Sequence, residues 1–214
     1  MSPLRRPLPW LALGVLLLVA GLWFFWPRRA SLRSFDPAAM GRLEADMWHC
    51  YYDKRYFGLA WDLWQTARGQ YGFSPWDSLR LARHAALAAK AAQPVQTRDQ
   101  AYTHALPDLI NYYRIICRST GTKDQAEDLA DAELNWWVLR REGVGVKGYG
   151  EAVSKATALL YGVPENAVHD PAMLRAEMMD YRDQRREGLM TADDWRHIAG
   201  RLSESYAMLL EAVK

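Results

Sequence analysis

Cysteine is scarce in this chain, and the motifs of several common chemistries are absent. Cys50 and Cys117 are the only cysteines, and neither belongs to a Cys-x-x-Cys pair typical of metal or redox sites. Two buried thiols are the first interpretation, and a disulfide is the alternative for a domain outside the cytoplasm. The sequence also lacks a Gly-x-Ser-x-Gly elbow, a glycine-rich phosphate loop and a Cys-x-x-Cys-His haem motif. These absences argue against several enzyme and cytochrome classes, and we expect no cofactor.

Neither sign of charge dominates. The chain has 27 Lys and Arg against 25 Asp and Glu, a net charge of +2, and the two signs are interspersed. Binding to a phosphate backbone requires a basic stripe, so we expect no nucleic-acid partner. Half of the residues are apolar and 12% are aromatic, a composition typical of a globular protein with a sizeable core or an aromatic interface.

One long hydrophobic run stands near the start of the chain. The segment WLALGVLLLVAGLWFFW, from Trp10 to Trp26, contains no charge and is flanked on both sides by arginines. Its length is at the lower limit for crossing a bilayer, and its terminal aromatics are typical of membrane interfaces. A cleaved signal peptide is the alternative, but the following FFWPRRA lacks a small-x-small cleavage site. We therefore predict a membrane anchor over residues 1–29 and a separate domain over residues 30–214.

The remaining chain has the helix-start signals and apolar spacing of an all-α protein. Asp36, Ser74 and Asp170 each precede a proline, which is typical of a helix cap followed by the first helical position. Apolar residues recur at intervals of three and four near the carboxyl end, and no long two-residue alternation occurs. Pro107 should interrupt or kink its helix. We predict a bundle of six to eight helices after the anchor. The apolar stripe of its last helix comprises Trp195, Ile198, Leu202, Tyr206, Leu209 and Val213.

Two glutamates lie beside tryptophans on predicted helices. Glu44 stands four residues before Trp48, and Glu133 stands four residues before Trp137. An unpaired carboxylate on an apolar face is unfavourable, so each should be paired, protonated or bound to a ligand. Arg114 shares a predicted helical face with Ile110 and Cys117. We therefore expect Glu44, Glu133 and Arg114 to form buried ion pairs.

A metal site is the alternative explanation of these carboxylates. Helical di-metal proteins use Glu-x-x-His pairs, which this chain lacks, but it contains two Asp-x-x-His pairs, DMWH and DWRH. The candidate ligands are Glu44, Asp46, His49, Glu133, Asp194 and His197. Glu44 and Asp46 project in different directions on one helix, which counts against the set.

Exposed tryptophans at helical spacing are a third kind of candidate site. They favour an interaction surface over a catalytic pocket, and the residues are Trp61, Trp64 and Trp76. We therefore expect a membrane-tethered interaction or assembly subunit that binds a protein partner and is not an enzyme. The alternative is a metal-dependent enzyme or redox protein. Arginines after the anchor, Arg28, Arg29 and Arg33, suggest an accessory contact with anionic lipid headgroups.

The segments MWHCYYDKR and ELNWW resemble features of a group of bacterial membrane-anchored helical proteins with no known activity. The resemblance covers the chain from Leu43 onward, and it implies a bacterial source and one continuous domain. We expect a single-pass protein of the bacterial inner membrane. The flanking arginines nearly balance, with a slight preference for a periplasmic domain.

Overall fold

The computed structural model describes residues 8–95, 97–185 and 188–214, and these residues form helices and no strands. The all-α prediction is therefore confirmed. The α-helices are α1 (Leu8–Phe25), α2 (Pro37–Tyr52), α3 (Tyr56–Gln65), α4 (Pro75–Ala92), α5 (Arg98–His104), α6 (Leu106–Thr120), α7 (Ala126–Glu142), α8 (Gly145–Tyr161), α9 (His169–Asp183) and α10 (Ala192–Val213). A π-helical turn, Thr66–Gln70, continues α3, and a 3-10 turn, Glu165–Ala167, precedes α9.

Nine of the described α-helices follow the first, which exceeds the predicted six to eight. A break at Ala105 separates the seven-residue α5 from α6, and Pro107 lies in the first turn of α6. Proline is tolerated there because the first-turn N–H groups have no intrahelical acceptor. The predicted interruption thus produces two helices instead of a kink in one.

Capping residues set most of the predicted helix starts. The side chains of Asp36 and Ser74 accept backbone N–H bonds at the starts of α2 and α4, each followed by a proline. Thr191 forms a reciprocal capping box at the start of α10. α9 instead begins at His169, so the third predicted cap, Asp170, lies inside the first turn, where the helix dipole favours an acid.

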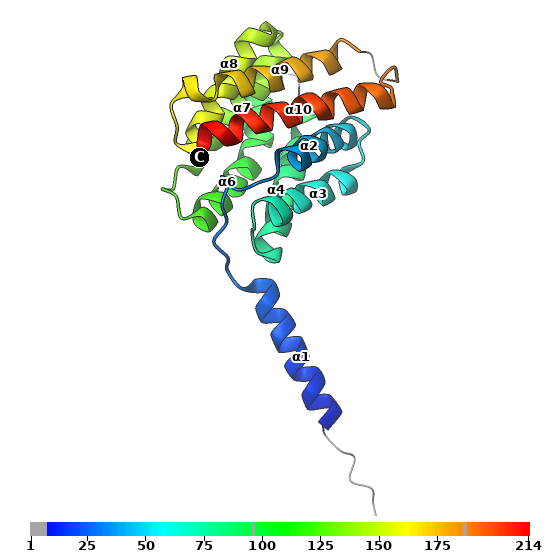
Figure 1. Cartoon of the computed structure of the whole chain (residues 1–214), viewed down its shortest axis with the longest axis vertical. Helices are drawn as coiled ribbons and strands as arrows, with labels where there is room; N and C mark the ends of the chain where they lie inside the picture. Colours follow the sequence, from blue (N-terminus) through cyan, green and yellow to red (C-terminus); the bar gives the residue numbers. More distant parts are fainter. Residues whose placement is uncertain (1–7, 96, 186–187) are drawn as a thin grey trace, which may run out of the picture.

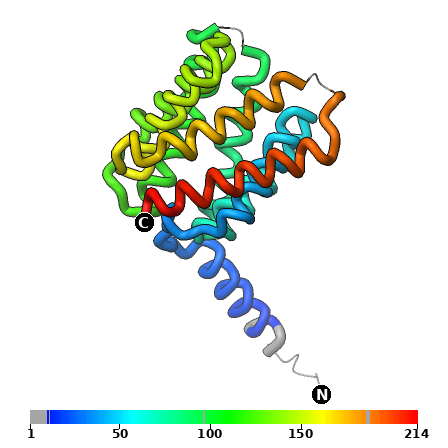
Figure 2. The backbone as a smooth tube through the Cα atoms, turned by 45° about the horizontal axis from the view of Figure 1, so that its top comes forward, coloured from blue at the N-terminus to red at the C-terminus, as the bar shows by residue number. Residues whose placement is uncertain are grey.

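The helices from α2 onward form a closed ring (Figure 1). From α6 to α10 each helix packs against the next in the chain, α4 packs against α3 and α6, and α10 packs along α2 to join the two ends. Figure 2 shows α2 and α10 side by side. Gly41 of α2 allows the close approach, because a Cβ atom there would lie 2.7 Å from the Cα of Ser203 on α10. The interior of the ring provides the space for a central cavity.

The hydrophobic core is divided among the seams of the ring. One cluster joins α4, α5, α6 and α7, and three smaller clusters join neighbouring helices around the rest of the ring. In the predicted stripe of α10, Ile198, Leu202, Leu209 and Val213 are buried, as expected for its core-facing side. Cys50 and Cys117 are both buried and free.

The first helix extends away from the ring (Figure 1). None of the 18 residues of α1 is charged, and the five consecutive side chains of residues 15–19 are each 59–64% exposed. Five consecutive positions point to every side of a helix, so this stretch of α1 is apolar and exposed all round. Within the described residues, no helix combines the length and hydropathy expected of one that crosses a bilayer.

Candidate functional site

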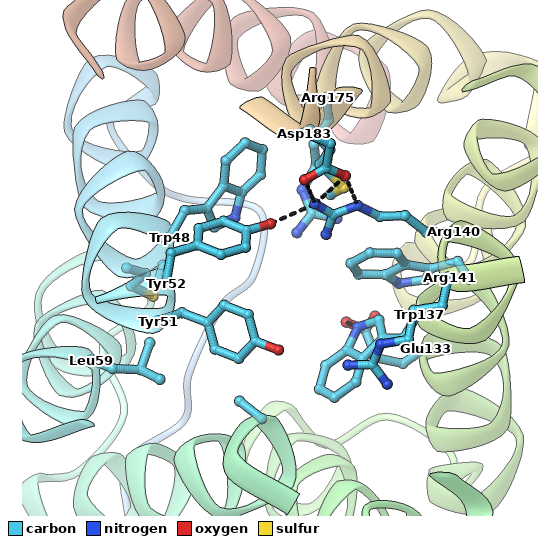
Figure 3. A pocket seen from close by; sticks show the side chains of 14 residues that line it. Trp48, Tyr51, Tyr52, Leu59, Glu133, Trp137, Arg140, Arg141, Arg175 and Asp183 are labelled. Carbon is cyan, nitrogen blue, oxygen red and sulfur yellow. Dashed lines mark hydrogen bonds and ion pairs between the residues drawn. The ribbon is translucent and has the colours of Figure 1, made fainter. Parts of the chain in front are cut away.

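The ring encloses a cavity of about 390 Å³ between α2, α3, α4, α7 and α9, here called the central cavity (Figure 3). Its volume lies within the roughly 300–1,000 Å³ range of small-molecule sites. Five aromatic side chains line it, and they are Trp48, Tyr51, Tyr52, Trp136 and Trp137. Such rings provide large, flat apolar walls, while their N–H and O–H groups supply polar contacts.

Helical spacing brings the residues of α7 to the cavity. Glu133, Trp137 and Arg141 stand at intervals of four, and Trp136 and Arg140 lie between them at the same interval. Residues four apart lie on one face of a helix, so this short stretch presents two aromatic and three charged side chains to one space. Trp48, Tyr51 and Tyr52 face them from α2 (Figure 3).

Arg140 is held on the cavity wall by partners from two other helices. Its Nε lies 2.9 Å from Asp183 Oδ2 and its Nη2 lies 2.7 Å from Asp183 Oδ1, a two-bonded pair, and it also donates to the Tyr52 hydroxyl (Figure 3). Burial alone would lower the pKa of Arg140, but Tyr52 and Asp183 outweigh burial and raise it. Arg140 therefore joins α7, α9 and α2 as a fixed cation.

Arg175, the second cavity arginine, pairs with a different carboxylate, that of Glu44. The pair is 2.6 Å apart, and the guanidinium of Arg175 lies 5.2 Å from the centre of the Trp136 ring. Burial alone would lower the pKa of Arg175, and Glu44 reverses this effect and raises it. The other oxygen of Glu44 accepts a hydrogen bond from the hydroxyl of Tyr206 at 2.7 Å. Glu44 is 2% exposed and lies behind the cavity lining, where it orients Arg175.

The predicted pairing with Arg114 is wrong. Arg114 lies on the solvent face of α6 and pairs with Glu127 at 2.7 Å, with more than half of each side chain exposed. Glu44 finds its cation in Arg175 of α9 instead. Glu133 accepts neutral donors, the indole of Trp137 at 3.0 Å and the hydroxyl of Tyr113 at 3.1 Å. Two neutral donors can satisfy a half-buried carboxylate, so no arginine is required beside it.

Arg141 is the cavity arginine without an ion-pair partner among the described residues. It is exposed to solvent, and although burial raises the pKa of the nearby Tyr51 hydroxyl, the charge of Arg141 lowers it to a smaller extent. Arg140 pairs with Asp183 and Arg175 pairs with Glu44, whereas neither Glu133 nor Arg141 forms an ion pair with a described residue. Eight positions separate them, which is about 12 Å along the helix axis. The central cavity therefore presents a guanidinium at its exposed edge and, two turns earlier on α7, a carboxylate.

The six candidate metal ligands lie in separate environments. No group of three or more His, Cys, Asp or Glu side chains in the described chain could hold a metal ion. His49 stacks on Trp195 and contacts Asp53 at 3.2 Å. Asp46 is exposed. The structure therefore does not bring the two Asp-x-x-His pairs together with the two glutamates.

The pair Asp194 and His197 has its own local contacts. Asp194 caps α10 through Thr191 and pairs with Arg185 at 3.0 Å, and its pKa is lowered chiefly by the Thr191 backbone N–H. The ring of His197 lies 4.9 Å from that of Tyr181. Both side chains thus have a role in holding the start of α10 against the end of α9.

The three predicted interaction tryptophans occupy two places. Trp61 and Trp64 stack on each other at 5.2 Å on α3, and Trp61 is 51% exposed. Trp76 lies at the start of α4 against Phe24 and Phe25 of α1. None of the three lines the central cavity. Sequence reasoning missed Arg140, Arg141 and Arg175, although the four-residue spacing from Glu133 to Trp137 and Arg141 was a readable signal.

Comparison with known proteins gives no relative from which to transfer a function, because no family model, curated protein or solved structure matches the chain.

Proposed function

We propose that this chain is a membrane-tethered, non-catalytic binding subunit whose central cavity holds a small anionic ligand with a flat apolar body. The observation that carries the proposal is Arg141, which lies at the edge of an aromatic cavity and has no carboxylate partner among the described residues. Arginine binds carboxylate, sulfonate or phosphate oxygens through two parallel hydrogen bonds. The indoles of Trp137 and Trp48 would cover the flat body, and Glu133 would accept a donor from its far end.

The tether in this proposal is α1, as a single-pass anchor in a bacterial inner membrane. It is supported by the uncharged run from Trp10 to Trp26 and by the exposure of apolar side chains on every side of α1. A continuous apolar surface of this kind is rare in water and typical of membrane or protein interfaces. An 18-residue helix rises about 27 Å, close to the thickness of a hydrocarbon core.

The ligand proposal is tested with a matched pair of probes, 2-naphthalenesulfonate and the neutral 2-naphthalenesulfonamide. Calorimetric titration of the full chain in maltoside micelles should show that Arg141→Gln weakens sulfonate binding about tenfold, because one charged hydrogen-bonded pair is lost. Sulfonamide binding should be unchanged by this substitution, whereas Trp137→Ala should weaken binding of both probes.

Arg201→Gln is the matched control, since Arg201 is a surface arginine of α10 paired with Glu204 outside the cavity lining. Empty micelles provide the blank. Sulfonate binding that is equally strong in the parent and in the Arg141→Gln and Trp137→Ala variants would show that the cavity does not hold the anion.

A second candidate function is protein docking through α3. Phe57, Trp61 and Trp64 lie at intervals of four and three, and Phe57 is 88% and Trp61 51% exposed. Aromatic residues at this spacing anchor helices in partner grooves. Co-purification from the native host should recover a stoichiometric partner with the parent chain, and a Phe57→Ser/Trp61→Ser variant should lose it. Absence of such a partner from the parent preparation would count against docking.

A further inference from the structure

A second hollow, of about 740 Å³, lies where α1 meets the ring, between the end of α1, the start of α4 and the end of α6. Four arginines line it, Arg28, Arg29, Arg80 and Arg118, and we call it the basic hollow. It shares no lining residue with the central cavity. The junction of α1 and the ring can be followed in Figures 1 and 2.

The positive charge of the basic hollow is only partly balanced. Asp77 is its one acidic lining residue, and its Oδ1 serves two arginines, Arg118 at 2.9 Å and Arg80 at 3.6 Å. Arg28 and Arg29 have no ion-pair partner among the described residues. The carbonyl groups at the end of α6 carry a partial negative charge that offsets part of the excess. An excess of positive charge remains, which favours an anion.

Arg68 extends this charge beside the hollow. The guanidinium groups of Arg28 and Arg68 lie 5.2 and 5.8 Å from the ring centre of the same indole, Trp23. Burial and the neighbouring charge of Arg28 lower the pKa of Arg68. Two cations on one ring repel each other, so an anion placed nearby would relieve this repulsion.

The hollow also has an apolar side. Phe25, at the end of α1, lies 5.3 Å from Trp76, at the start of α4, between ring centres. Trp76 is 38% exposed, so an apolar surface adjoins the arginines. A ligand that fits both parts carries a negative head and a hydrocarbon tail.

We propose that the basic hollow binds the phosphate of an anionic glycerophospholipid, with its acyl chain along Phe25 and Trp76. Arginine clusters next to a membrane segment favour such headgroups, and arginine matches phosphate geometry. The proposal rests on the proposed insertion of α1, since that insertion puts the hollow at the level of the headgroups. Bound lipid would then orient the ring relative to the bilayer.

The structure corrects the set of lipid-binding arginines expected from the sequence. Arg33 is exposed, and its guanidinium donates to the backbone oxygen of Val213 at 2.6 Å and to that of Tyr161. It therefore holds the ends of α10 and α8, and Arg80 and Arg118 from distant parts of the chain take its place in the hollow.

The test uses the full chain in neutral maltoside micelles, titrated with phosphatidylglycerol or phosphatidylcholine, with bound lipid counted by native mass spectrometry. We expect phosphatidylglycerol to bind about tenfold more tightly, because phosphatidylcholine carries the same phosphate beside a choline cation that the arginines would repel, a difference of about one charged contact. Arg28→Gln and Arg80→Gln/Arg118→Gln should each remove the preference. Arg28 lies outside the helices and contacts Trp23, so its replacement leaves the ring intact.

Arg114→Gln is the matched control on α6, because Arg114 pairs with Glu127 outside the basic hollow and the preference should persist. Equal affinity for the two lipids, or a preference unaffected by both variants, would overturn the proposal. Thermal unfolding is also measured with each ligand added. If inorganic phosphate raises the unfolding temperature as much as phosphatidylglycerol does, the hollow is a free phosphate site and the lipid assignment is overturned.

A separate measurement distinguishes this proposal from the anchor on which it rests. Alkaline carbonate should leave the full chain in the membrane pellet if α1 is inserted. Extraction into the supernatant would reject the anchor, whereas loss of lipid preference in micelles rejects the basic hollow.

Discussion

Glu44 is the most buried carboxylate of the described chain, and its two oxygens connect three helices. One oxygen pairs with Arg175 of α9, and the other accepts the Tyr206 hydroxyl of α10, while Glu44 itself belongs to α2. Removing a buried partner leaves the opposite charge uncompensated, which destabilises far more than losing a surface pair. The stability of the ring and the orientation of a cavity arginine therefore depend on this one side chain.

We predict that Glu44→Gln lowers the free energy of unfolding by about 3 kcal/mol, because the partly buried Arg175 would lose the counter-charge that Glu44 supplies. Urea denaturation of the parent and the variant measures this change. Glu127→Gln, at the exposed pair with Arg114, should cost less than about 1 kcal/mol. Equal, small losses in the two variants would contradict the assignment of Glu44 to a buried pair.

The sequence indicated that Glu44 needs a partner but could not identify it. A carboxylate on an apolar helical face is unfavourable alone, and this argument requires only the local pattern. Arg175 lies 131 positions away, and the contact exists because α2 and α9 meet across the ring. The choice of Arg114 as the partner rests only on the apolar face of its own helix. Arg141 could be found from local spacing, whereas the absence of an ion-pair partner for it among the described residues depends on where distant acids fold.

Helices and their starts are the best predicted elements of this chain, because proline and capping side chains act within one turn. The break between α2 and α3 is different, since it contains Asp53, Lys54 and Arg55 and neither glycine nor proline. Lys54 has a positive φ of 57° there, a conformation that its residue type does not signal. The packing partner of each helix is likewise not local. Gly41 shows this, because its role depends on α10.

We predict that Gly41→Ala destabilises the chain by about 3 kcal/mol, because the added Cβ would collide with the backbone of Ser203 and force α2 and α10 apart. Thermal and urea unfolding measure the effect. Gly200→Ala is the matched control within α10, since nothing lies within 4 Å of its Cβ position.

The control should stabilise by roughly 0.5–1 kcal/mol, because alanine has the higher helix propensity. A Gly41→Ala variant as stable as the parent would mean that the two helices are not in close contact in solution.

At the scale of the whole molecule, the ring distributes its core among several seams instead of one centre. Tyr113, Tyr161 and Tyr149 belong to three different clusters, and all three side chains are buried. Helical periodicity predicted the core-facing side of α10. It could not predict that α10 returns to pack along α2, and the cavity exists because of that closure. Whether the seams unfold as one domain over residues 30–214 is therefore a testable property.

The buried tyrosines give that test through their ionisation. Burial raises the pKa of Tyr149 and Tyr161 to about 12, and burial followed by the charge of Glu133 raises that of Tyr113 well above its usual range. Unfolded tyrosine titrates near pH 10, so from about pH 10 to 12 the folded chain binds more protons than the unfolded chain. Stability should therefore be fully present below pH 10 and fall as pH rises through this window.

We predict one cooperative alkaline transition in which the absorbance of phenolate at 295 nm and the loss of helical circular dichroism coincide. Coincidence follows because ionisation of tyrosines in three seams then requires the opening of a single domain. Tyr149→Phe should reduce the pH dependence of stability between pH 10 and 12, and it removes the hydroxyl bond to the Ala176 carbonyl, a loss of about 1 kcal/mol near neutral pH. Phenolate absorbance of the buried tyrosines Tyr113, Tyr149 and Tyr161 that rises in separate steps, with helix content retained, would show that the seams open independently and that the ring is not one cooperative unit.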